Sequence, residues 1–251
     1  MLSERLALAV TVVGIPALCW AWVIAMGTDM YGPMTGASAW MMSFDWDARR
    51  LVLLWAMWAA MMAGMMLPSA APILLLYGGA ARAKRSGGQG GPVYAMAAGY
   101  VLIWAAFSIG ATILQRLLAT RFLITPMMEP AMPAVSAAVL AMAGIYQLTP
   151  LKQICLTRCR SPLSFLMQHW RRGVAGAFRM GAHHGAYCVG CCWALMLILF
   201  AGGVMNLAVI AGLTAWVIIE KLAPFGERSA RAAGFVLLAA AAWLLFQATA
   251  A

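Results

Sequence analysis

The amino-acid sequence predicts an all-α fold: a polytopic bundle of about seven transmembrane helices in one integral membrane domain over residues 1–251. Composition is the first reason. Hydrophobic residues make up 65% of the chain and charged residues only 10%, whereas about a quarter of a soluble globular domain is charged. Length is the second reason, because uncharged runs of about 20 residues recur, and a hydrocarbon core about 30 Å thick requires helices of that length.

Seven apolar segments are predicted to span the membrane: 6–26, 51–77, 93–114, 131–149, 182–204, 205–222 and 232–251. The first could instead be a cleaved signal peptide, although Glu4 and Arg5 make a poor n-region for one. The fifth and sixth come from one uncharged run, 185–219, which is too long for a single span. Gly202, Gly203 and Asn206 favour a turn within it.

Basic residues indicate the orientation of these spans. The loop 78–92 contains Arg82, Lys84 and Arg85. The segment 150–181 contains no acidic residue and six basic ones: Lys152, Arg158, Arg160, Arg171, Arg172 and Arg179. The positive-inside rule therefore predicts a bacterial inner (cytoplasmic) membrane protein with its N-terminus inside and both segments in the cytoplasm. Segment 27–50, with Asp29, Asp45 and Asp47, is then outside.

The net charge of +10 follows mostly from this topology. The lipid bilayer is the expected partner of these basic residues, with Arg171 and Arg172 meeting anionic headgroups. Nucleic acid is not an expected partner, because the charges flank apolar spans.

The segment 150–181 is predicted to be a cytoplasmic, cysteine-containing connector between spans four and five. Within it, Ser161 can N-cap a helix whose first residue is Pro162. Apolar residues then fall on one face at helical spacing: Leu163, Leu166, Met167, Trp170, Val174 and Phe178. This pattern over 161–180 predicts an interfacial amphipathic helix.

The stretch "HHGAYCVGCCWALM", residues 183–196, carries the strongest chemical signal. Residues spaced i, i+4, i+7, i+8 and i+12 share one helix face. That face carries four soft sulfur donors and an imidazole: His184, Cys188, Cys191, Cys192 and Met196. His183 lies about 100° away, so a solvated or second-shell role is as reasonable for it as ligation. Small residues that merely pack between membrane helices are the alternative.

Cys155 and Cys159 form a second group, spaced i and i+4, on the same predicted face of the membrane. Lys152, Arg158 and Arg160 surround them and favour the thiolate over the thiol. Structural disulfides are not expected in a reducing compartment. Spacing alone leaves open whether the two cysteine groups form one metal site or two. Cys19 stands alone and is expected to be a small buried hydrophobic residue.

A methionine stripe adds further sulfur. Met57, Met61 and Met65 share one face of the second span. At about 1.5 Å per residue, Met65 lies ~18 Å and Cys192 ~15 Å above the cytoplasmic boundary, so the two sulfur stripes reach the same depth. Methionines that only fill apolar space are the alternative interpretation.

Glu220 is a carboxylate in an apolar span. A hairpin that turns at Gly203–Val204 brings it opposite Tyr187 and next to Cys188. It is therefore a candidate to hold the metal ligands in place by hydrogen bonding, or to accept a proton beside the thiols. Pairing with Lys221, or snorkelling to the interface, is the alternative.

Several blocks of the sequence resemble a known family: "AMMAGMMLPSAAP", "AGIYQLTPLKQICLTRCRSPLSF", "GAHHGAYCVGCCWALM", "GGVMN" and "EKLAPFGE". They are similar to the bacterial family described as predicted metal-binding integral membrane proteins. The resemblance covers residues 51–235, and its most specific part is the Cys-x2-Cys-Cys-Trp block. It implies that these cysteines and histidines bind a metal ion.

Soft thiolate and thioether donors select Cu(I) first and Zn(II) second. The leading hypothesis is therefore a membrane protein that binds Cu(I) and transports it or passes it to a partner protein, without catalysing a reaction. No Gly-x4-Gly-Lys-Ser/Thr motif is present, so pumping by ATP hydrolysis is not expected. Two alternatives stay open: a membrane thiol–disulfide oxidoreductase, and a non-catalytic subunit with a structural zinc or packed cysteines.

Overall fold

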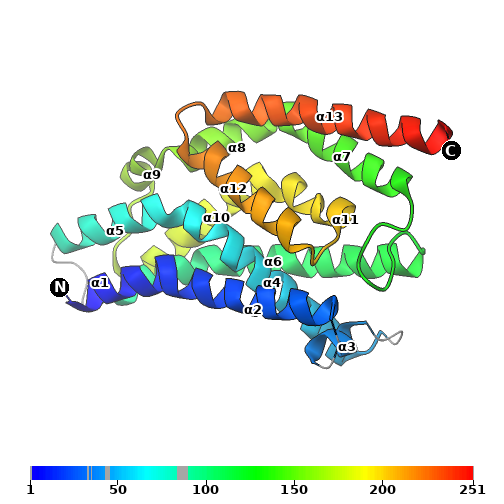
Figure 1. Ribbon diagram of the computed structural model, residues 1–251. Helices are drawn as coiled ribbons and strands as arrows, with labels where there is room; N and C mark the ends of the chain where they lie inside the picture. The colour runs from blue at the N-terminus through cyan, green and yellow to red at the C-terminus, as the bar shows by residue number, and fades with distance from the viewer. Residues whose placement is uncertain (1, 33, 35, 43–45, 84–89, 251) are drawn as a thin grey trace.

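A computed structural model describes residues 2–32, 34, 36–42, 46–83 and 90–250. Within these residues the regular structure is helical, apart from one isolated bridge between Ile124 and Pro130. The long helices run side by side as an elongated bundle, with the two termini at opposite ends (Figure 1). The predicted all-α class is confirmed.

The first half of the chain begins with α1 (Leu2–Ala9), a π-helical turn (Val10–Gly14) and α2 (Ile15–Met30), which continue as one long apolar helix. It continues with α3 (Ala37–Met41), α4 (Ala48–Met66), a 3-10 turn (Pro68–Ala70), α5 (Ala71–Ala83) and α6 (Gly91–Thr120). The Asp47 carboxylate caps α4 by accepting a hydrogen bond from the Arg50 backbone at 2.8 Å. Pro68 interrupts the helical hydrogen bonds, so α4 and α5 are joined through a tighter turn.

The second half contains α7 (Pro133–Leu148), α8 (Pro150–Arg160), α9 (Pro162–His169), α10 (Gly173–Leu197), α11 (Leu199–Gly202), α12 (Leu207–Leu222) and α13 (Gly226–Ala250). Helices α7 and α8 meet at 67°. Thr149 between them is extended, because a residue that precedes a proline avoids the helical conformation. Gly203 has a φ of +91°, and the predicted turn of the α10–α12 hairpin lies there.

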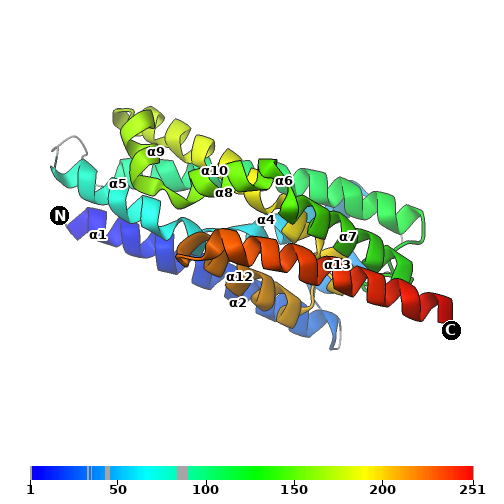
Figure 2. The same ribbon diagram turned by 90° about the horizontal axis from the view of Figure 1, so that it is seen from above.

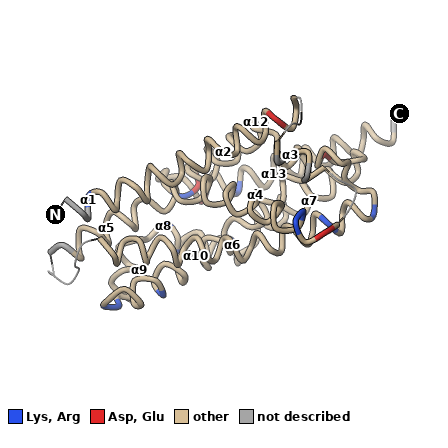
Figure 3. Tube along the Cα trace, turned by 90° about the horizontal axis from the view of Figure 1, so that it is seen from below, with Lys and Arg blue, Asp and Glu red and all other residues tan. Residues whose placement is uncertain are grey.

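Five helices among the described residues are long and apolar enough to cross a membrane, and the bent α7–α8 pair makes six if it counts as one span. Helix α12, at 16 residues, falls short of that length. The count of seven therefore stays a prediction. Charged residues are sparse along the bundle and lie both toward its ends and at a few places inside it (Figure 3). Lys84, Arg85 and Asp45, used to predict the orientation, lie outside the described residues.

The segment 161–180 differs from the predicted single interfacial helix. Helix α9 ends at His169, because Trp170 leaves the helical conformation with a ψ of 122°. Helix α10 then begins at Gly173, whose φ of +76° glycine accommodates. Residues from Gly173 onward belong to α10, so Val174 and Phe178 extend that long helix instead. Helix α9 exposes Leu163 and Met167, and whether it lies in the membrane interface stays a prediction.

Close helix packing positions the cysteines. Helix α10 lies against α6, and a Cβ atom added to Gly181 would overlap the Met96 carbonyl oxygen. Small residues allow such an approach of two backbones. Helix α8 packs against α10 on another side, and α13 runs along α7 on the side of the bundle that faces the viewer in Figure 2. The middle of α10 is therefore enclosed by its neighbours.

Candidate metal centre

Three cysteine sulfurs from two helices meet inside the bundle. Cys159 at the end of α8, with Cys188 and Cys191 on α10, place their Sγ atoms within 4.8 Å of one another, and all three are buried. The bend between α7 and α8 turns Cys159 toward α10. We call these three residues the thiol cluster.

The other two cysteines predicted for this region lie beside the thiol cluster. The Cys192 Sγ is 3.2 Å from the Cys191 Sγ, and Cys192 is buried too. Cys155 is one turn before Cys159 and half-buried, and it packs over Gly190 of α10. A Cβ atom at Gly190 would lie 2.8 Å from the Cys155 sulfur, so the glycine makes room for this side chain.

The histidines separate as their helical positions predict. His184 is 3% exposed, one turn before Cys188, with its ring 6.0 Å from that of Tyr100 and 5.2 Å from that of Phe165. Its Nδ1 atom has no hydrogen-bond partner among the described residues. His183 is exposed, and its ring meets that of His169 edge-on at 4.6 Å. Only His184 therefore offers a buried ring nitrogen near the thiols.

Lys221 is the partner of the thiol cluster that sequence reasoning missed. Its ammonium donates to the Cys188 Sγ at 2.8 Å and to the Ser69 Oγ at 2.9 Å, and the side chain is buried. The Tyr100 hydroxyl lies 2.9 Å from the same sulfur. The hairpin argument placed Glu220 here. Successive side chains on a helix point about 100° apart. An error of one residue in the predicted turn therefore puts Lys221, and not Glu220, beside Cys188.

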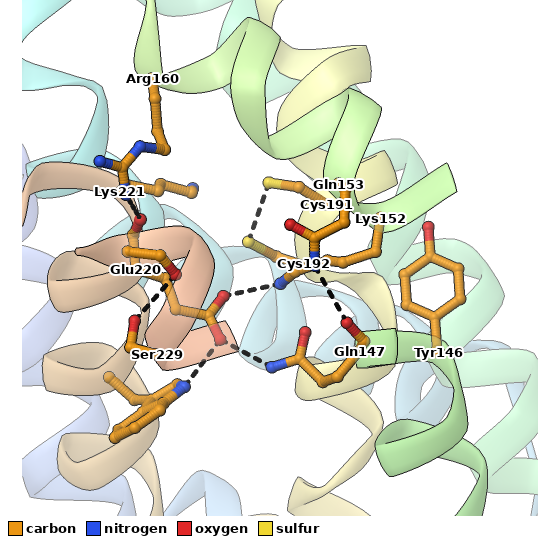
Figure 4. Close-up of polar contacts among 12 residues, drawn as sticks. Tyr146, Gln147, Lys152, Gln153, Arg160, Cys191, Cys192, Glu220, Lys221 and Ser229 are labelled. Atoms are coloured by element: carbon orange, nitrogen blue, oxygen red, sulfur yellow. Dashed lines mark hydrogen bonds and ion pairs between the residues drawn. The ribbon is translucent and has the colours of Figure 1, made fainter. Parts of the chain in front are cut away.

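Glu220 faces away from the thiol cluster into a buried polar network (Figure 4). One carboxylate oxygen accepts from the Lys152 ammonium at 2.6 Å, and the other accepts from Gln147 at 2.6 Å and Trp216 at 2.8 Å. Glu220 and Lys152 are both fully buried. Glu220 therefore pairs with Lys152, and not with Lys221 as the alternative interpretation of the sequence held. The Lys152 ammonium also lies close to Cys192.

Arg160 joins the end of α8 to the end of α12. Its guanidinium donates to the carbonyl oxygens of Glu220 at 2.7 Å, Ala223 at 2.6 Å and Pro224 at 3.3 Å. These carbonyls lack partners within the helix, so a cation at the C-terminus satisfies them and complements the helix dipole. Because Cys159 precedes Arg160 on α8 and Lys221 follows Glu220 on α12, this contact also fixes the position of Lys221 relative to Cys159.

The methionine stripe lies in the core. Met57, Met61 and Met65 of α4 are at most 1% exposed, and Met196 on α10 is fully buried. Met66, which borders the stripe, is the methionine that contacts a residue of the site: its Sδ lies 3.9 Å from the Lys221 ammonium. This contact joins α4 to the thiol cluster through Lys221.

The charges of the site leave one positive charge in excess. Lys152 and Lys221 are buried cations and Glu220 is the buried carboxylate near them. A buried cation needs an anionic or strongly polar partner, and Lys221 has the Cys188 sulfur. This arrangement favours a thiolate, the form of cysteine that binds metals. The residues present therefore fit a soft metal ion.

Fold and site together define an all-helical protein with several helices apolar enough for a membrane and a buried cysteine cluster suited to a soft metal. A family described as PpoB2, copper chaperone, matches residues 55–244, and the chain belongs to this family. The match supports the predicted resemblance to a metal-binding family; the Cys-x2-Cys-Cys-Trp signature and the bacterial origin stay predictions. Neither a curated protein nor a solved structure matches the chain.

Proposed function

We propose that this protein binds Cu(I) at the thiol cluster within the membrane and passes the ion to a partner protein. The observation that carries the proposal is the meeting of three buried sulfurs, Cys159, Cys188 and Cys191, within 4.8 Å beside the Lys221 ammonium. Membership of a copper chaperone family supports copper as the ion and a protein as its recipient.

Charge favours a monovalent ion held by thiolates. Cu(I) bound by two thiolates carries a net charge of −1, which balances the excess positive charge of Lys152, Lys221 and Glu220. Soft sulfur donors also prefer Cu(I) to harder ions. The third cysteine completes the coordination as a neutral thiol, and the buried nitrogen of His184 remains as an exchangeable donor.

A site that binds its ion too tightly does not transfer it. Release therefore requires a neighbouring donor that binds the ion while a first donor dissociates from it. Cys192, whose sulfur lies 3.2 Å from that of Cys191, supplies such a donor. Met196, one turn further along α10, supplies a weaker thioether. A step between adjacent sulfurs keeps Cu(I) bound throughout, and supports hand-over rather than permanent storage.

Metal analysis of the purified full chain tests the proposal. With reductant present, loading with Cu(I) followed by removal of loosely bound metal is expected to leave about one copper per chain. Zinc that resists the same treatment and excludes copper would instead indicate a structural zinc site. A reversible disulfide without bound metal would favour thiol–disulfide exchange.

The methionine stripe is proposed to carry Cu(I) between the thiol cluster and the outer side of the membrane. Substituting Met57, Met61 and Met65 together by leucine removes the sulfurs and preserves volume, so each change costs less than about 1.5 kcal/mol in stability. We expect this variant to retain copper at the cysteines but to move it much more slowly, measured as copper flux in vesicles. Wild-type flux would show that the stripe only fills space.

A further inference from the structure

A partly open cavity of about 210 Å³ leads to one edge of the thiol cluster. Cys159, His184 and Lys221 line its buried part, whereas half-buried Arg160 and Leu222, which is 49% exposed, lie toward the surface. The cavity thus connects the outside of the protein with the Cys159 sulfur.

The cavity is cationic. Arg160 and Lys221 both line it, and no carboxylate is among its described lining residues. The carboxylate of Glu220, the residue before Lys221, already accepts from Lys152, Gln147 and Trp216. Arg160 is held by neutral carbonyl groups, so its charge is not cancelled. A bare copper cation is therefore repelled at this opening, and an anion is attracted.

The buried part of the cavity offers two metal donors. His184 has an Nδ1 atom without a hydrogen-bond partner among the described residues, although the side chain is 3% exposed. Buried polar atoms are almost always paired, so an unpaired one points to a ligand. Cys159 lines the same cavity. An incoming soft metal meets these two donors before the deeper Cys191.

We propose that copper reaches the thiol cluster through this cavity as an anionic complex of Cu(I) with small-molecule thiolates. The inference rests on the proposed function and names the form in which the ion arrives. Ligand exchange then transfers Cu(I) without redox change: [Cu(SR)2]⁻, the Cys188 thiolate and one further cysteine thiol give the bis-cysteine complex, one RSH and one RS⁻. The proton lost by the cysteine thiol is taken up by one departing thiolate, and the other departs as the anion. Lys221 stays beside the negative charge throughout.

A second cavity, of about 480 Å³, shares Arg160 with the first and provides room for the organic part of the thiolate ligands. Arg228 and Glu227 line it, and the Glu227 carboxylate accepts a hydrogen bond from Thr157 at 3.1 Å. With two arginines and one carboxylate it remains net positive. An acidic thiol carrier, with carboxylates of its own, fits this charge.

Uptake rates from two copper sources test the inference. The probes are the anionic Cu(I)–glutathione complex and the tetrakis(acetonitrile)copper(I) cation, each mixed anaerobically with the purified full chain. Thiolate-to-Cu(I) absorption reports the transfer. Rising salt is expected to slow uptake from the anionic probe, because screening weakens attraction, and to leave uptake from the cationic probe unchanged or faster.

Arg160→Gln is expected to slow uptake from the anionic probe about 10-fold relative to the cationic one, as electrostatic steering at a charged opening predicts. Arg158→Gln is the matched control: it removes the same charge from an exposed position on the same helix, outside the cavity, and should leave both rates unchanged. Arg160→Lys keeps the charge and should keep the preference.

The outcomes separate this inference from the proposed function. Equal salt dependence for both probes in the wild-type protein overturns the cationic route, even if Arg160→Gln fails to fold, while copper binding stands. If a folded Arg160→Gln variant keeps the wild-type ratio of the two uptake rates, anionic probe to cationic probe, the cationic route is also overturned. Failure to take up Cu(I) from either probe overturns the proposed function itself.

Discussion

Cys159→Ser, Cys188→Ser and Cys191→Ser are each expected to weaken Cu(I) binding by about 100-fold or more. Loss of a group that merely supports a metal ligand already costs 10–100-fold, and these substitutions remove a sulfur of the thiol cluster itself. Serine keeps the size of the side chain but replaces a soft donor by a hard one. Competition with a Cu(I) chelator under reducing conditions measures the change.

Two controls sharpen this experiment. Cys19→Ser removes a half-buried thiol on α2, beside Gly64 of α4, and should leave Cu(I) affinity unchanged. Cys155→Ser should have a small effect, because that sulfur packs over Gly190 outside the thiol cluster. Wild-type affinity in Cys159→Ser would show that α8 contributes no ligand, and would confine the site to α10.

Lys152→Met is expected to destabilise the protein by about 3–5 kcal/mol, because it leaves the Glu220 carboxylate as an uncompensated buried charge. The two groups lie 2.6 Å apart and are both fully buried. Methionine fills the apolar part of the space without supplying a cation. Equilibrium unfolding in mixed detergent micelles measures the loss.

The double variant Lys152→Met with Glu220→Gln tests the cause. It removes both charges, and the carbonyl oxygen of the glutamine at position 220 still accepts hydrogen bonds from Gln147 and Trp216. The double variant should therefore recover most of the lost stability. Arg158→Met, an exposed change on the same helix, should shift stability by no more than about 0.5 kcal/mol. A double variant no more stable than Lys152→Met would rule out charge pairing as the source of the effect.

Local patterns were predictable because helix geometry relates neighbouring residues without reference to the rest of the chain. The spacing of His184, Cys188, Cys191 and Cys192 places them on one face of any α-helix, and all four are buried in the structure. The same geometry set His183 apart, and it is exposed. The glycine turn after α10 was also local, since Gly203 adopts a positive φ there.

Contacts between helices were harder to predict. The hairpin argument found the right stretch of α12 but placed Glu220 where Lys221 lies. A helix rotates its side chains by about 100° per residue, so a small error in the turn exchanges a carboxylate for an ammonium. The prediction for segment 161–180 was wrong for another reason: the helix breaks between His169 and Gly173, and a hydrophobic pattern does not record such a change of backbone conformation.

The sequence by itself determined that this chain forms apolar helices and that α10 carries a stripe of sulfur and imidazole donors, because composition and helical periodicity are properties of contiguous residues. Only the tertiary structure decided that Cys159 joins that stripe, that Lys221 holds Cys188 and that Lys152 neutralises Glu220. The positions of Cys159 and Lys152 depend on the 67° bend before α8, and those of Lys221 and Glu220 on the rotation of α12 about its axis. Both are set by packing between helices distant in the chain, which local spacing does not encode.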